Sequence, residues 1–251
     1  SENWQLLYNS LTNEQRKLWD SAYEPKNRAF LEANLSGTEL AKWKYQRYIK
    51  DYLRCVASVD DNIGRLLDYL DEHGLTDNTV VIYTSDQGFY LGEHGWYDKR
   101  FMYEESLGMP LIIRYPQEIS AGMTLDEMVL NLDFCPTILD YAGVEVPAEI
   151  QGESLRSLLR GHPSPQWRQM IYYHYYEYPH GWHDVKRHYG IRTQKFKLIH
   201  FYDDIDAKEL YDLQQDPHEL NNVYGRTQFN GIQNKLETQL KELKNYYMDY
   251  E

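Results

Sequence analysis

Two oxygen-bearing side chains, Asp86 and Gln87, directly follow the short apolar run 79–84. Apolar side chains on both faces of this run predict a buried central strand of a parallel sheet, and ligands bind beyond the carboxyl ends of such strands. Carboxylate and amide oxygens suit a hard divalent cation such as Ca²⁺. By itself, Asp-Gln-Gly after a strand is more often a simple turn, so the surroundings must decide.

The loop that follows is rich in glycine and in charged groups, and it precedes a second predicted strand at 110–115. Lys99 and Arg100 lie at its far end, so a folded loop could bring them to the same ion as Asp86. Surface ion pairs with the nearby Asp98 and Glu104 are the alternative.

The runs 83–95, 98–100 and 109–116 together resemble the second signature block of the type I sulfatases, which belong to the alkaline phosphatase-like superfamily. Asp98-Lys99-Arg100 with a following Tyr-Glu is most similar to the N-acetylglucosamine-6-sulfatase and heparan-type branch. Similarity at 58–64, 131–139 and 209–222 extends the resemblance over nearly the whole chain.

The resemblance implies a role for each matching residue. Asp86 and Gln87 would be ligands of one calcium ion, with glutamine as a known variant at the second position. Lys99 would contact the sulfate as a catalytic residue. Arg100 would either bind substrate or brace the loop.

The C-terminal subdomain of this family closes over the mouth of the active site and contributes to sugar recognition. On that basis His183 or His188 could hydrogen-bond a sugar, and Arg192 or Lys186 could meet a further acidic group. A solvated hairpin surface explains the same residues equally well. A basic patch on an acidic chain would concentrate a sulfated carbohydrate at the cleft.

The family's nucleophile, a formylglycine made within a Cys/Ser-x-Pro/Ala-x-Arg motif, has no counterpart in the sequence. The two aspartates that complete the family's calcium site are not identifiable either, and Asp60-Asp61 falls within a predicted helix. We therefore expect the formylglycine outside this chain, in an N-terminal sulfatase segment or partner chain. The chain alone would be inactive.

The chain carries 26 Lys and Arg against 39 Asp and Glu, a formal net charge of −13. This balance argues against nucleic acid or an anionic membrane as the main partner. No apolar run has the length of a transmembrane segment. No signal peptide is visible, and the resemblance implies a periplasmic, secreted or lysosomal location. Cys55 and Cys135 are too few for a disulfide framework, and their pairing stays open.

The elements that must position these residues follow from the apolar spacing. Residues 1–36 are polar and are expected to be irregular with short helical turns. Apolar side chains at helical spacing predict a long helix from Thr38 to the stop at Gly74. Another helix is expected at 133–141. With the two buried strands, and by the resemblance, this predicts part of an α/β fold of the alkaline phosphatase-like type, a mostly parallel sheet between helices.

The pattern changes after a linker at 162–165. Strand-like pieces at 170–176, 188–193, 196–202 and 209–212 precede a helix at 229–247, which predicts a small antiparallel sheet with one helix. We therefore expect two domains, 1–162 as the C-terminal part of the catalytic α/β domain and 163–251 as a C-terminal α+β subdomain.

Two main functional hypotheses remain. The chain could be part of an active sulfatase that acts on sulfated carbohydrate, 6-O-sulfated N-acetylglucosamine of a glycosaminoglycan or mucin glycan by the branch resemblance. Alternatively, it could be a truncated, non-catalytic module that binds a sulfated sugar or a protein partner. Phosphatase or phosphodiesterase activity fits less well, because an Asp-Gln pair does not suit two transition metals.

Overall fold

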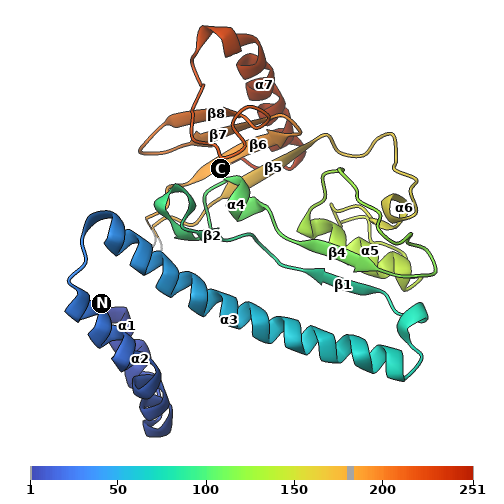
Figure 1. The fold of residues 1–251 in the computed structure, drawn as a ribbon. Coiled ribbons are helices and arrows are strands. Elements are labelled where there is room, and N and C mark those ends of the chain that lie inside the picture. The colour runs from blue at the N-terminus through green and yellow to red at the C-terminus, as the bar shows by residue number, and fades with distance from the viewer. Residues whose placement is uncertain (1, 180–183, 251) are drawn as a thin grey trace. The chain divides into compact units, whose positions relative to one another are not determined.

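The computed structural model describes residues 2–179 and 184–250. The chain divides into two compact units, residues 1–65 and 66–251, and each is described by itself. Its helices and strands are α1 (Glu2–Ser10), α2 (Asn13–Ala33), α3 (Gly37–Glu72), β1 (Val81–Thr84), β2 (Tyr90–Leu91), β3 (Tyr97–Asp98), α4 (Glu104–Leu107), β4 (Leu111–Arg114), α5 (Phe134–Tyr141), α6 (Arg156–Leu159), β5 (Met170–Tyr175), β6 (His188–Thr193), β7 (Phe196–Phe201), β8 (Ala207–Asp212) and α7 (Asn230–Tyr246) (Figure 1). Short 3-10 helices lie at Thr76–Asn78, Glu93–Gly95, Asn131–Asp133 and Thr227–Phe229.

The first unit is helical, so the prediction of irregular structure at its N-terminal end was wrong. A capping box starts α2: the Thr12 hydroxyl accepts the Gln15 backbone N–H, and the Gln15 side chain accepts the Thr12 N–H. Pro25 lies inside this helix, where it removes one backbone hydrogen bond. The long helix predicted from Thr38 is confirmed as α3.

In the second unit, β1 and β4 form a two-stranded antiparallel pair in which Tyr83 lies opposite Ile112. Both strands lie where the sequence predicted them. The expected parallel arrangement is corrected for this pair, because apolar side chains on both faces indicate burial and do not encode strand direction. The loop between the strands contains the β2–β3 hairpin and α4.

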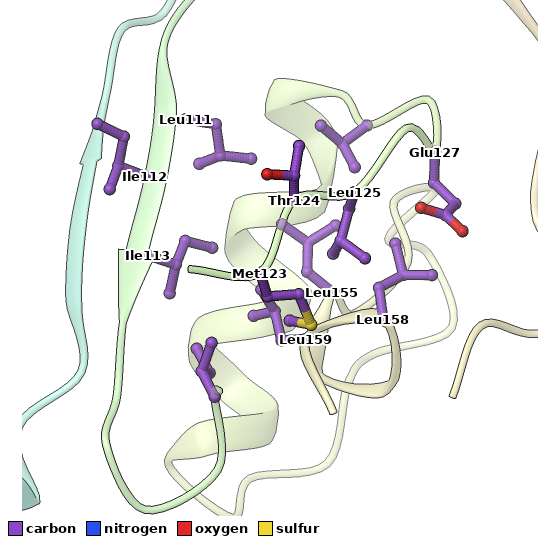
Figure 2. Close-up of a pocket in the computed structure, with 12 residues that line it drawn as sticks. Leu111, Ile112, Ile113, Met123, Thr124, Leu125, Glu127, Leu155, Leu158 and Leu159 are labelled. Carbon is purple, nitrogen blue, oxygen red and sulfur yellow. The ribbon is translucent and has the colours of Figure 1, made fainter. Parts of the chain in front are cut away.

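One face of β4 packs against the segment around α6. Leu111 and Ile113 contact a cluster formed by Leu155, Leu158 and Trp167. Figure 2 shows the apolar cavity of about 350 Å³ that lies beside this cluster. On the β1–β4 pair, Tyr83 and Ile112 remain 40% and 64% exposed. These two apolar side chains are cross-strand neighbours, and both keep part of their surface exposed.

Strands β5 to β8 form an antiparallel sheet in chain order, and α7 follows them (Figure 1). This part of the second unit confirms the predicted antiparallel sheet with one helix. The predicted boundary at residue 162 stays a prediction.

The two faces of this sheet have different coverings. Helix α7 packs on one face through Leu236 and Leu240, which join a core that includes Leu198 and Leu210. On the other face, the segment 101–107 packs through a second core made of Tyr90, Met102, Tyr103, Ile199, Phe201 and Tyr211. Gly190 permits this close approach, because a Cβ atom there would lie 2.4 Å from the Met102 sulfur. The sheet therefore supports the loop that follows β3.

Two further features bear on the sequence predictions. Cys55 and Cys135 are both free and exposed. None of the helices in residues 2–179 and 184–250 is long and apolar enough to cross a membrane.

Candidate active site

Five segments of the second unit line a cavity of about 420 Å³. Asp86 and Gln87 come from the turn after β1, and Lys99 and Arg100 come from the loop after β3. The loop thus folds back and brings these four residues to one cavity. The remaining lining residues are Ser106, Leu107, Met109, Val129, Leu130, Asn131, Leu132, Ile171, Tyr172, Tyr173, Tyr175 and Glu177.

The turn that carries Asp86 and Gln87 is held against α4. The Gly88 N–H donates to the Ser106 carbonyl at 2.8 Å. A Cβ atom at Gly88 would lie 2.2 Å from the Glu105 carbonyl oxygen, so only glycine fits this approach. Asn131 donates to the Asp86 carbonyl at 3.4 Å. These contacts fix the backbone of the Asp86 turn relative to the Lys99 loop.

Asp86 and Gln87 offer an incomplete set of ligands for a hard cation. The Asp86 side chain is exposed, and within the described chain its carboxylate accepts a hydrogen bond only from Ser85, at 3.5 Å. A carboxylate so lightly engaged, beside an amide oxygen, fits calcium. Calcium takes six to eight oxygen ligands, however, and residues 2–179 and 184–250 contain no group of three or more Asp, Glu, His or Cys placed for a metal. A calcium ion at this position would therefore need further ligands beyond these two side chains.

Lys99 and Arg100 share one carboxylate. The Lys99 Nζ lies 3.2 Å from Asp98 Oδ1, and the Arg100 guanidinium donates to the other oxygen of Asp98. Burial raises the pKa of Asp98, but its bonds to Arg100 and Lys99 outweigh that effect and lower it. With two cations and one anion, Asp98, Lys99 and Arg100 together carry a net positive charge, which suits an anionic substituent at their side of the cavity, while Asp86 and Glu177 place carboxylates elsewhere in its lining.

Strand β5 and the residues just after it supply a wall of aromatic and acidic side chains that the sequence interpretation missed. Tyr173, Tyr175 and Glu177 line the cavity at alternate positions. The Tyr173 hydroxyl donates to the Arg100 carbonyl at 2.7 Å, and Tyr175 donates to Glu177 at 3.4 Å. The density of tyrosine in residues 172–178 was the available signal. Aromatic faces beside a carboxylate suit the apolar face and the hydroxyls of a sugar ring.

The residues predicted to contact sugar from the C-terminal subdomain occupy other places. Arg192 lies on β6 and donates both Nε and Nη2 to Glu104, at 3.2 and 3.1 Å. His188 is fully buried among the rings of Phe101, Tyr175 and Phe201. Neither residue lines the cavity, so this geometry does not support direct sugar contact. His183 falls outside the described residues.

Burial gives His188 a testable pH signature. Removal from water lowers its pKa from 6.5 to about 4, although its Nδ1 lies 2.8 Å from the Lys186 carbonyl. As the pH falls, His188 therefore binds a proton in the unfolded chain before it does so in the folded chain. The free energy of unfolding consequently decreases between about pH 6.5 and about pH 4. In urea unfolding, H188F should lose less stability over this window, by about 3 kcal/mol. H218F, which replaces an exposed histidine, is the control and should show the same pH dependence of stability as the parent. If the parent and H188F lost stability in parallel over this pH range, the buried, neutral state of His188 would be contradicted.

Two protein-family models match the chain. The model described as "Sulfatase" covers residues 8–144, and the one described as "N-sulphoglucosamine sulphohydrolase, C-terminal" covers residues 92–246. Each spans more than half of the sequence. The chain belongs to the sulfatase family.

Individual relatives agree with this membership. The sulfatase chain is 54% identical, over 97% of its length, to an N-acetylglucosamine-6-O-sulfatase of Bacteroides thetaiotaomicron, of which it covers 44%. It is 32% identical, over 78% of its length, to arylsulfatase K of Mus musculus, of which it covers 35%. The sulfatase chain therefore spans less than half the length of these curated relatives.

A solved structure described as a complex with its substrate D-glucosamine-2-N,6-O-disulfate superposes with a TM-score of 0.90. The two proteins are 53% identical, and the match covers 97% of this sulfatase chain and 50% of the other. This agreement confirms the predicted fold class, part of an alkaline phosphatase-like α/β fold. It also confirms the resemblance to the N-acetylglucosamine-6-sulfatase branch.

Proposed function

We propose that this chain forms part of a sulfatase that hydrolyses the 6-O-sulfate ester of N-acetylglucosamine in a glycosaminoglycan or mucin glycan. The observation that carries the proposal is the cavity in which Asp86 and Gln87 meet Lys99 and Arg100. The 54% identity to an N-acetylglucosamine-6-O-sulfatase supports the choice of sugar and sulfate position.

Within this proposal, each wall of the cavity has a separate task. Lys99 holds the sulfate group by charge and offsets the negative charge that grows on it during hydrolysis. Arg100, which its bond to Asp98 orients, binds the sugar beside that group. Tyr175, at the end of β5, and Glu177, two residues beyond it, line the cavity and offer a ring edge or face and a hydrogen-bond acceptor for sugar hydroxyls.

Asp86 and Gln87 would hold one calcium ion through their side-chain oxygens. When bound, the ion supplies positive charge that stabilises the sulfate oxygens. The donor chemistry of the two side chains and the exposed position of Asp86 support this role. The remaining ligands and the formylglycine nucleophile would come from an N-terminal sulfatase segment or partner chain.

The exposed apolar surface of Tyr83 and Ile112 on the β1–β4 pair supports such an N-terminal partner. Tyr83 and Ile112 present apolar surface to water, and β1 has a neighbour on only one edge within the described chain. A further strand on the open edge would satisfy backbone groups, and its connections would cover the two side chains. We also place the assembled enzyme in the periplasm or outside the cell, as is typical of its relatives.

The test is sulfate release from 6-O-sulfated N-acetylglucosamine by the purified protein with its N-terminal sulfatase portion, in the presence of calcium. Intact mass should reveal a formylglycine-containing polypeptide in the same preparation. The 2-O- and 4-O-sulfated sugars serve as controls and should release sulfate far more slowly. Binding of the 6-sulfate without release, in material that lacks formylglycine, would instead identify a non-catalytic sugar-binding module.

A further inference from the structure

The backbone on both sides of Lys99 adopts a conformation that side chains disfavour. Asp98 has φ 82° and Arg100 has φ 117°, and neither residue is glycine. Residues keep such angles only where surrounding contacts force them to, and such sites concentrate at active sites. The contacts that hold this loop therefore decide where the Lys99 and Arg100 side chains point.

Part of the restraint comes from direct hydrogen bonds to the loop backbone. The Arg100 N–H donates to the Ser106 hydroxyl at 3.1 Å, and the Arg100 carbonyl accepts from Tyr173 at 2.7 Å. Tyr90 donates to the next carbonyl, that of Phe101, at 3.1 Å. Both polar backbone groups of Arg100 are thus bonded, which ties its peptide units to α4 and to β5.

A buried ion cluster anchors the other end of the loop. Lys197, on the face of β7 that the loop covers, lies 2.8 Å from Glu104 and 2.7 Å from Glu219. Glu219 also accepts the Glu104 backbone N–H at 2.7 Å, and Arg192 makes two bonds to the Glu104 carboxylate. The side chains of Lys197 and Glu219 are completely buried. The cations Lys197 and Arg192 and the anions Glu104 and Glu219 therefore form one cluster at Glu104, the first residue of α4.

Each member of this cluster depends on the others. Burial raises the pKa of Glu219, and Lys197 only partly offsets that effect. For Glu104 the balance is reversed: burial raises the pKa, but Lys197 and Arg192 together lower it. Without Lys197, Glu219 would be a buried acid with no cation within reach, and it would protonate or turn toward water. Its bond to the Glu104 N–H is then weakened or lost.

We propose that Lys197 is a positioning residue that, through Glu104 and Glu219, holds the 98–106 loop in the conformation that presents Lys99 and Arg100 to the cavity. Lys197 itself does not line the cavity and touches no substrate. The structural claim stands on the contacts alone, and only its consequence for turnover rests on the proposed sulfatase function.

Hydrogen exchange of K197M, measured peptide by peptide on the full chain, tests the structural claim. Peptides within residues 97–107 should exchange about tenfold faster or more, while peptides of α7 keep their protection. K208M is a matched control, because Lys208 lies on the neighbouring strand and pairs at 3.0 Å with Glu237 of α7. It should leave residues 97–107 unchanged.

A second variant separates positioning from general stability. K197M/E219Q removes one charge of each sign and leaves the Glu104–Arg192 pair, so it keeps the cluster neutral and favours folding. Loss of protection confined to residues 97–107 in this folded variant supports the proposal. Wild-type protection there, or an equal rise in exchange over the whole second unit, overturns it.

The catalytic consequence has a separate readout. In the assembled enzyme, K197M/E219Q should lower kcat/KM for sulfate release about 100-fold, because small misplacement of charged groups is costly to catalysis. A faster-exchanging loop with unchanged kcat/KM refutes the positioning of Lys99 and Arg100. If the parent enzyme itself releases no sulfate, the proposed function fails, and the exchange result still decides whether Lys197 holds the loop.

Discussion

K99A in an assembled enzyme should lower kcat for sulfate release about 100- to 1000-fold, the loss expected when one fixed group that stabilises transition-state charge is removed. Lys99 lines the cavity, and among the described residues it forms an ion pair with Asp98, its neighbour in the sequence. Steady-state kinetics with 6-O-sulfated N-acetylglucosamine would measure the change. KM should change less than kcat, because the charge matters most as the ester bond breaks.

The control for this experiment is K195A. Lys195 lies in the β6–β7 turn, is about half exposed, and is 3.9 Å from Asp212. Its removal changes the net charge by the same amount and should leave kcat within about twofold, since exposed pairs contribute little. An equal loss in both variants would point to a general charge effect, and a full rate in K99A would refute the assigned role.

D86A should weaken calcium binding at least about 100-fold, because it removes the carboxylate that is assigned to the ion in the proposed site. Calcium titration by calorimetry, with the protein joined to its N-terminal portion, measures the affinity directly. Thermal unfolding gives a second readout, since an ion that binds only the folded state raises Tm with its concentration. D86A should lose this calcium-dependent rise.

D60A distinguishes the proposed metal ligand from another acidic position. Asp60 and Asp61 lie on α3, in the segment that the sequence predicted as helix. We interpret them as surface residues of that helix, so D60A should bind calcium as tightly as the parent. Weak calcium binding in D60A together with normal calcium binding in D86A would show that Asp60, and not Asp86, is the metal ligand.

The sequence predicted most elements that carry the site, because their signals are local. The alternating strands after residue 170 and the apolar spacing of α3 were read correctly. The antiparallel pairing of β1 with β4 was not, since strand direction depends on chain connections and not on which faces are apolar. Helix α2 was not predicted, because its composition is polar and because Pro25 is unusual inside a helix. The capping box at Thr12 was the sequence signal that indicated its start.

Within the site, the sequence predicted that residues of one loop lie close together, but it did not predict contacts between residues of distant strands. Asp86 and Lys99 belong to one signature run, so their shared cavity could be expected. Lys197 is a single lysine in a strand, and lysine side chains are almost always exposed to solvent, so the sequence alone predicts an exposed position. Its burial follows from Glu104 and Glu219, which lie 93 residues before and 22 residues after it in the numbering. Only the folded chain reveals that these charges meet.

If Lys197 and Glu219 hold α4 as proposed, they also limit how this sulfatase chain can be recombined with relatives. The loop that carries Lys99 belongs to one stretch of sequence, whereas the charges that hold it belong to β7 and the segment after β8. A chimera that exchanges residues 163–251 for those of another family member would keep the loop but replace its anchors. Compatible recombination would require Glu104, Lys197 and Glu219 to be inherited together, whatever sugar the exchanged part was chosen to recognise.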